Sequence, residues 1–246
     1  MVSFLRHNAW VGPEDFGSET FNIIGVGATG SHIALFLAKM GVHNFKIWDH
    51  DIVESHNLPN QVYDMAHIGM PKVEALKQIL QRFNPAIKVE TIQRYFTHEE
   101  DGADLSGPLV LTVDTMKARK DIFNTFNGSM TIPLVIETRL GFDFGELYVI
   151  SPMNNDECNK WSSSLKNDDE IPEGPCNLRI CTTLVALIAS TATHAICSYY
   201  AAERAGNTWS FGYRTLFHLS PSLSVYSMQN ISNTKVQGDE QCVTSI

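Results

Sequence analysis

The chain has 246 residues, of which 43% are hydrophobic and 18% are charged. This length and balance suit one α/β domain with a sizeable core and exclude a largely disordered chain. The net charge of -9 opposes binding to nucleic acid or to an anionic membrane, because no run of lysines and arginines provides a local basic patch.

The cysteines and the first residues bear on the cellular compartment. Five cysteines occur at irregular spacings, namely Cys158, Cys176, Cys181, Cys197 and Cys242. An odd number of cysteines at irregular spacings favours reduced thiols over a set of disulfides. The first residues lack the apolar run of a signal peptide, so we expect a cytoplasmic protein. Residues 181–200 form the most apolar stretch, but they carry threonines, serines and His194, which favours a buried core helix over a membrane span.

In chain order, apolar patterning predicts alternating strands and helices over the first 150 residues. A buried strand at 21–26 precedes a helix that ends at Gly41. The next predicted elements are a strand at 44–48, a helix at 72–83, strands at 87–92 and 109–113, a helix at 118–126, and strands at 134–137 and 146–150. This alternation predicts a Rossmann-like, mostly parallel sheet with helices on both faces.

The second part of the chain has a different pattern. Residues 153–175 are rich in Asn, Asp, Glu, Ser and Pro, and they predict a long loop. A helix at 178–204 and strands near 210–219 and 223–228 follow, which predicts an antiparallel C-terminal extension. We interpret the chain as a single domain with an N-terminal arm (1–20), a nucleotide-binding core (21–150), a crossover loop (151–177), and a C-terminal helix with strands (178–231).

A glycine-rich loop separates the first strand from the first helix. Gly25, Gly27 and Gly30 fit the pattern G-x-G-x-x-G, with Ala28 and Thr29 between the last two. Such glycines permit a tight turn and a close approach of phosphate to the backbone at a helix N-terminus. The carboxylate that grips a ribose lies about 20 residues further on in this motif, which points to Asp49. The alternative is a tight turn without a ligand.

The stretch WDHDIVESHNLPNQ at 48–61, with the motifs after it, resembles the ThiF/MoeB/HesA family of ubiquitin-activating-enzyme-like adenylyltransferases. The matching positions are Asp49, Asp51, Val53, Asn57, Leu58, Gln61, Gly69, Lys72, Asn84, Pro85, Ile87, Asp114 and Arg119. The resemblance covers residues 21–151 well and the rest loosely.

The resemblance implies ATP and Mg²⁺ as ligands. It implies that Asp49 holds the ribose, Lys72 neutralises the triphosphate and Asp114 binds magnesium. It also places Asp51, Asn57, Asn60 and Gln61 around the nucleotide. Each has a plainer interpretation: Lys72 as a solvated helix lysine, Asp114 as a helix N-cap, and Asp51 as the cap of a turn.

Two departures from the family pattern stand out. Asn60 stands where the family has an arginine, and an amide brings neither charge nor a bidentate fork. Arg6, Arg139 and Lys117 are the candidates for a replacement cation. The paired C-x-x-C ligands of a zinc site are incomplete, so we expect no structural zinc. Cys158 is the candidate nucleophile of the crossover loop, with a small buried residue as the equal alternative.

The resemblance predicts an adenylyltransferase that activates a carboxylate, with a ubiquitin-like or sulfur-carrier protein ending in Gly as partner. The alternative is a catalytically weakened nucleotide-binding scaffold subunit, and an NAD-dependent oxidoreductase is a third interpretation. The resemblance also predicts a C₂ homodimer, for which the apolar residues 184–188 and Ile196 are the expected contact surface.

Overall fold

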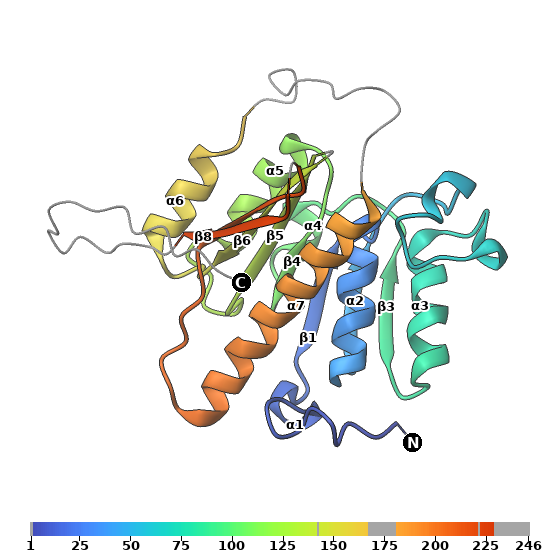
Figure 1. Ribbon diagram of the computed structural model, residues 1–246, viewed down its shortest axis with the longest axis horizontal. Coiled ribbons are helices and arrows are strands. Elements are labelled where there is room, and N and C mark those ends of the chain that lie inside the picture. Colours follow the sequence, from blue (N-terminus) through green and yellow to red (C-terminus); the bar gives the residue numbers. More distant parts are fainter. Residues whose placement is uncertain (1, 142, 167–180, 221, 229–246) are drawn as a thin grey trace, which may run out of the picture.

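Residues 2–141, 143–166, 181–220 and 222–228 are described by a computed structural model, and they contain an eight-stranded sheet in the order β3-β2-β1-β4-β5-β6-β7-β8 (Figure 1). The strands are β1 (Thr20–Ile24), β2 (Asn44–Trp48), β3 (Lys88–Ile92), β4 (Leu109–Leu111), β5 (Val135–Leu140), β6 (Phe144–Ile150), β7 (Arg214–His218) and β8 (Ser224–Met228). The first five are parallel, and β5 to β8 are antiparallel. The predicted fold class is confirmed.

Helices cover both faces of the sheet, because successive strand residues point to opposite sides. Ile23 packs in the cluster that contains α2 (Ala28–Met40), α3 (Lys72–Phe83) and α7 (Thr182–Ala205). Its neighbour Ile24 packs in the other cluster, with α5 (Met116–Phe126) and α6 (Asn155–Ser163). The short elements are α1 (Pro13–Phe16), α4 (His98–Asp101), and the 3₁₀ turns Ser55–Asn57 and Met65–His67.

Glycines set the ends of α2. Gly25 has φ +89°, and Gly41 ends the helix at φ +111°, both in the region that side chains avoid. A Cβ on Gly30 would lie 2.1 Å from the carbonyl oxygen of Gly25. The loop therefore folds back tightly on the helix start and leaves the helix N-terminus facing the strand ends.

The predicted long loop at 151–177 is wrong in part, because α6 (Asn155–Ser163) lies inside it. The Asn154 side chain accepts hydrogen bonds from the N–H groups of Asp156 and Glu157 and caps the helix. Cys158 and Trp161, three residues apart, are fully buried against the sheet. Residues 167–177 of that loop lie outside the described residues.

By length and composition α7 could cross a membrane, but 56% of its apolar window is buried inside the protein. It packs on α2, β5 and β6, as a core helix does. Leu184, Val185, Ile188 and Ile196 are all fully buried in this core. These four side chains cannot belong to the dimer surface that we expected of residues 184–188 and Ile196, although Ala186 is exposed and Leu187 is half-buried. The homodimer itself stays a prediction.

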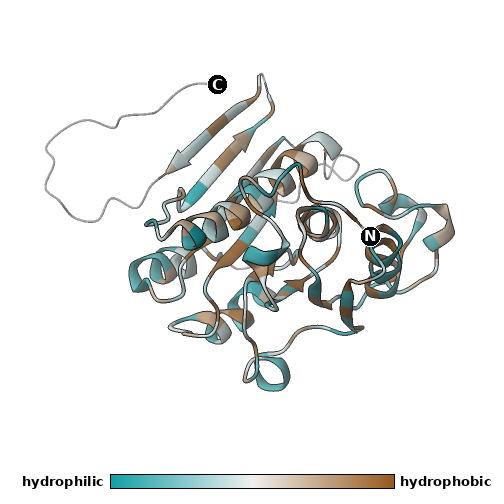
Figure 2. Cartoon of the chain, turned by 90° about the horizontal axis from the view of Figure 1, so that it is seen from below, coloured by the Kyte–Doolittle hydropathy of each residue, from teal (hydrophilic) through white to brown (hydrophobic). Residues whose placement is uncertain are grey.

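The last hairpin contrasts with this core. Figure 2 shows β7 and β8 as a ribbon at one end of the sheet, with hydrophobic segments along it. Val225, Tyr226 and Met228 of β8 are exposed. The sheet edge therefore carries apolar side chains that no described helix covers.

Candidate functional site

A cavity of about 330 Å³ lies at the carboxyl ends of the parallel strands. Its walls come from the loops after β1, β2, β3 and β4 and from the start of α5. Strands β2 and β3 lie on one side of β1, and β4 and β5 lie on the other. The direction in which the chain adds strands to the sheet therefore reverses at β1. Open α/β sheets bind their ligands at this kind of switch point.

The glycine loop forms one wall. Gly25, Gly27, Ala28 and Thr29 all line the cavity. A Cβ on Gly27 would meet nothing within 4 Å, so the backbone faces open space there. The first N–H groups of α2 have no intrahelical partners and attract an anion to this wall. Gly30 does not line the cavity; it has the packing role described above.

Asp49 lies on the cavity wall at the end of β2, as the motif predicts. Its Oδ2 accepts a hydrogen bond of 2.8 Å from the N–H of Val26, and its Oδ1 accepts one of 2.9 Å from the N–H of Asp51. These bonds fix the carboxylate, and each oxygen keeps acceptor capacity toward the cavity. A fixed acceptor pair of this kind suits the two hydroxyls of a ribose.

Lys72 is not a solvated helix lysine. It starts α3, its side chain is 8% exposed, and its Nζ lies 2.6 Å from Oδ2 of Asp51. Tyr63 packs beside this pair, and its hydroxyl donates to the carbonyl oxygen of Val26. Burial, and then the charges of Asp49 and Asp51, raise the pKa of Tyr63 well above its usual value. The phenol therefore stays protonated and ties the glycine loop to the start of α3.

Asp114 lies exposed on the cavity wall after β4. The N-cap of α5 is Thr115, whose hydroxyl accepts a bond of 3.2 Å from the N–H of Ala118, so the N-cap interpretation of Asp114 is wrong. Among the described residues, one group has its ligand atoms close enough for a metal, namely Asp49, His50 and Asp51. Because Lys72 already pairs with Asp51, Asp114 is the better-placed carboxylate for a cation.

Four of the predicted site residues do not line the cavity, namely Gly30, Asn57, Asn60 and Cys158. Asn57 is buried, and its Oδ1 accepts a hydrogen bond of 2.9 Å from the N–H of Glu54. Asn60 lies outside the cavity, whereas Gln61 lines it. The side-chain oxygens of Asn60 and Gln61 are both buried without a hydrogen-bond partner in the described part of the chain.

For Cys158 the structure favours the buried-residue alternative over the nucleophilic role. The residue is fully buried in α6, and its thiol donates to the carbonyl oxygen of Pro152 at 3.5 Å. Burial, and then the charge of Glu157, raise its pKa. Cys181 differs, because hydrogen bonds from the Thr183 hydroxyl and then from the backbone lower its pKa at the start of α7. Cys176 and Cys242 lie outside the described residues.

The cavity is also lined by Arg94 and Arg119, two arginines that sequence reasoning did not assign to it. Arg94 donates to both oxygens of Asp101. None of our candidates for the missing cation, Arg6, Arg139 and Lys117, lines the cavity. Arg119 belonged to the quoted family pattern, but only its contacts in the fold reveal its partner.

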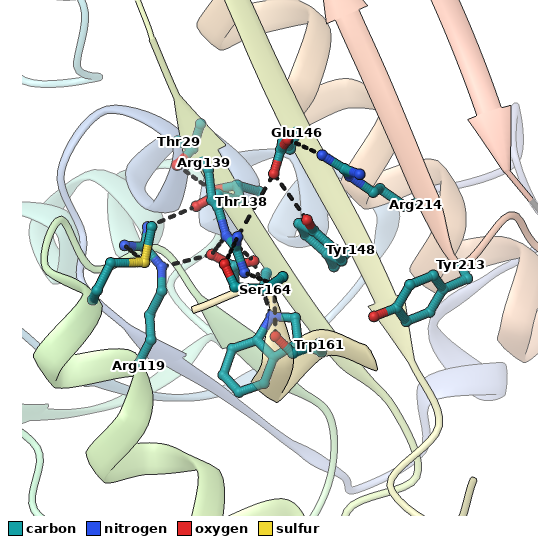
Figure 3. Close-up of polar contacts among 12 residues, drawn as sticks. Thr29, Arg119, Thr138, Arg139, Glu146, Tyr148, Trp161, Ser164, Tyr213 and Arg214 are labelled. Atoms are coloured by element: carbon teal, nitrogen blue, oxygen red, sulfur yellow. Dashed lines mark hydrogen bonds and ion pairs between the residues drawn. The ribbon is translucent and has the colours of Figure 1, made fainter. Parts of the chain in front are cut away.

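Arg119 reaches the cavity from a buried network (Figure 3). Its Nε donates to Glu137 at 2.6 Å, and a second nitrogen donates to the carbonyl oxygen of Thr138 at 3.2 Å. The Glu137 carboxylate also accepts bonds from Arg139 Nε at 3.0 Å and from Trp161 Nε1 at 3.1 Å. The network continues to Ser164, Glu146, Tyr148 and Arg214.

The charged side chains on the cavity wall balance. Three carboxylates face three cations, and His50 is neutral in this count. The carboxylates are Asp49, Asp51 and Asp114, and the cations are Lys72, Arg94 and Arg119. A triphosphate bound here would meet a wall without net charge, and a further cation would be needed to neutralise it.

Residues 12–230 match the sequence profile of the ThiF family. The chain belongs to the ThiF family. It is 31% identical over 157 residues to the sulfur carrier protein ThiS adenylyltransferase of Escherichia coli (strain K12), over 63% of the chain and 61% of that protein. It is 27% identical over 169 residues to the molybdopterin-synthase adenylyltransferase of the same organism, over 68% of each. The chain thus matches about six-tenths of the first relative's length.

Solved structures of low sequence identity share the fold. E. coli MccB with ATP superposes with a TM-score of 0.65 at 16% identity, over 88% of this chain and 65% of that one. E. coli tRNA N6-threonylcarbamoyladenosine dehydratase, TcdA, has a TM-score of 0.62 at 15% identity, over 79% and 91%. These likenesses show a shared architecture and no more.

Proposed function

We propose that this ThiF-family chain is an ATP-dependent adenylyltransferase that activates the C-terminal carboxylate of a ubiquitin-like or sulfur-carrier protein. One observation carries the proposal. The glycine loop, Asp49, Lys72 and Asp114 are far apart in sequence, yet all of them line one cavity at the switch point of the sheet. The two relatives from Escherichia coli are adenylyltransferases, which supports the same reaction class.

The proposed reaction transfers AMP to a carboxylate. A carboxylate oxygen forms a bond to the α-phosphorus, the bond from that phosphorus to the bridging oxygen breaks, and pyrophosphate leaves with the electron pair. No proton has to move, so neither a general base nor a cysteine is required. The step needs positive charge near the departing oxygens, and the Lys72 ammonium is the group that can supply it by leaving Asp51 for phosphate.

Magnesium fits this site on electrostatic grounds. The cavity wall has no net formal charge, and Asp114 is an exposed carboxylate on it. Hard cations such as Mg²⁺ bind carboxylate and phosphate oxygens and keep several waters. Bound between Asp114 and a triphosphate, the ion would supply the charge that the wall lacks.

A scaffold subunit is the second candidate function, and Asn60 favours it. The family arginine is absent there, and the two arginines on the cavity wall are already paired with acidic side chains. A chain with this balance of charge could bind ATP without completing the transfer. The scaffold would then support a catalytic partner subunit.

Pyrophosphate exchange into ATP separates the two candidates. The wild type is assayed with Mg²⁺ and with each of several small proteins that end in Gly-Gly, and ATP affinity is measured in parallel. Exchange that depends on one acceptor supports the enzyme. ATP binding without exchange for any acceptor supports the scaffold, and tighter binding of NAD than of ATP·Mg rejects both. In Asn60→Arg, exchange rises if the site is short of positive charge and falls if another cation already fills that place.

A further inference from the structure

The rim of the cavity carries two stacked rings that the proposed reaction does not use. His50 directly follows Asp49 after β2, and Tyr95 lies in the loop after β3. Both line the cavity. Their ring centroids are 3.9 Å apart, and their planes differ by 24°. Tyr95 is 66% exposed, so most of its ring is free to contact a ligand.

Polar contacts hold this exposed ring in place. The Tyr95 hydroxyl and His50 Nε2 share a hydrogen bond of 2.8 Å, and the same nitrogen lies 3.0 Å from Oδ1 of Asp51. The other oxygen of Asp51 contacts the buried ammonium of Lys72. A chain of polar contacts thus runs from a solvent-exposed ring to a buried charge.

The backbone under the ring is held as well. Arg94 donates to the carbonyl oxygen of Tyr95 at 2.9 Å and to the carboxylate of Asp101, whose side chain is 5% exposed. A side chain that is ordered before binding loses little further freedom when a ligand arrives. The ring is therefore prepared for a planar partner.

We propose that Tyr95 and His50 form a stacking platform for the base of the nucleotide, next to the ribose-binding carboxylate of Asp49. This inference rests on the proposed function, which puts ATP in the cavity. A ribose held by Asp49 brings its base close to the residue that follows Asp49 in the chain. Every base has a π-face, so the platform favours a nucleotide over a base-free phosphate without reading the identity of the base.

Calorimetric titrations with two probes test the platform. The probes are ATP·Mg and inorganic tripolyphosphate with Mg²⁺, which has the phosphates but no base. Tyr95→Ala should weaken ATP binding about tenfold, as loss of one base–aromatic stack does, and leave tripolyphosphate binding unchanged. Tyr95→Phe keeps the ring and should bind ATP within about twofold of the wild type. Tyr226→Ala removes an exposed tyrosine on β8, far from the cavity lining, and should change neither affinity.

The outcomes that overturn the platform differ from those that overturn the function. Equal ATP affinity in the wild type and Tyr95→Ala removes the platform and leaves the proposed function standing. An equal loss for ATP and tripolyphosphate in Tyr95→Ala also rejects stacking, because it places the damage at the phosphate side around Lys72. A wild type that binds tripolyphosphate and not ATP overturns both proposals.

Discussion

Two ion-pair clusters adjoin the cavity, and they differ in how much water reaches them. In the first, the Lys72 side chain is 8% exposed, but its partner Asp51 is 46% exposed. In the second, the Glu137 side chain is fully buried between Arg119 and Arg139, which are 5% and 12% exposed. The first cluster is open on the cavity side, and the second is closed.

This difference separates a contact that can be exchanged from one that cannot. Water can solvate Asp51 when Lys72 moves to a phosphate, so the exchange costs little. Water cannot solvate Glu137 in the same way, because its side chain is fully buried and its two oxygens already accept hydrogen bonds from two arginines and from Trp161. Removing one member of a buried cluster leaves unpaired charge behind. We therefore propose that the open pair takes part in ligand binding and that the closed cluster holds Arg119 at the cavity.

The largest expected effect comes from the closed cluster. Glu137→Ala leaves two buried guanidinium groups without their carboxylate and should lower the free energy of unfolding by about 3–5 kcal/mol. Denaturant titration measures the loss. Glu99→Ala removes an exposed glutamate and is the matched control. A loss below about 1 kcal/mol in Glu137→Ala would show that the closed cluster is no more important for stability than a surface pair.

For the open pair, the effect should appear in rate and not in stability. Lys72→Ala should slow pyrophosphate exchange roughly 10²–10³-fold, the usual effect of losing one preorganised charge contact. The free energy of unfolding should change by about 1 kcal/mol or less, since Asp51 remains solvated. Lys77→Ala, on the same helix but away from the cavity, is the control. Comparable losses in both variants would remove the special role of Lys72.

A smaller effect is expected when the competing carboxylate is neutralised. Asp51→Asn keeps the N–H that orients Asp49 and frees the charge of Lys72 for phosphate. ATP·Mg should bind about two- to fivefold more tightly, which corresponds to a partly exposed ion pair. Calorimetry measures the change. Weaker binding would mean that Asp51 itself serves the nucleotide or its metal.

Thiol alkylation across a pH series extends the comparison to α6. The thiolate is the reactive form, so Cys181, with a lowered pKa, should be labelled from a lower pH than an ordinary thiol. Cys158, with a raised pKa, and Cys197, whose pKa burial raises to about 12, should resist labelling in the native protein. Peptide mass spectrometry resolves the sites. Glu137→Ala, which releases Trp161 of α6, should make Cys158 more reactive, and equal labelling of Cys158 and Cys181 in the wild type would contradict the burial.

The sequence predicts those residues of the site whose positions depend on spacing along the chain. The glycines of the loop, the acidic residue at the end of β2 and the lysine that starts α3 each sit at a fixed place beside a strand or helix end. Apolar periodicity predicts those ends well. The mostly parallel sheet follows from the alternation of strands and helices, and the antiparallel extension follows from the late strand pairs, whereas the order of the strands is known only from the structure.

Contacts between distant segments could not be read in this way. Arg94 and Tyr95 reach the cavity only because β3 lies beside β2. Glu137 looks like any strand residue until α5 and α6 pack over it. The helix α6 had a local signal in Asn154 and the two acidic residues after it, and the polar composition around it concealed that signal. Asn57 matched a motif, yet its side chain serves the backbone of its own turn.

Mass spectrometry of the acceptor tests the central claim most directly. A sulfur-carrier or ubiquitin-like protein is incubated with the chain, ATP, Mg²⁺ and a pyrophosphatase. The mass of the acceptor's C-terminal fragment is then measured. The account predicts a fragment that carries one AMP group with the wild type, and none with Lys72→Ala at the same time point. If the wild type binds ATP but leaves every acceptor tried unmodified, the adenylyltransferase function is contradicted and the scaffold function remains.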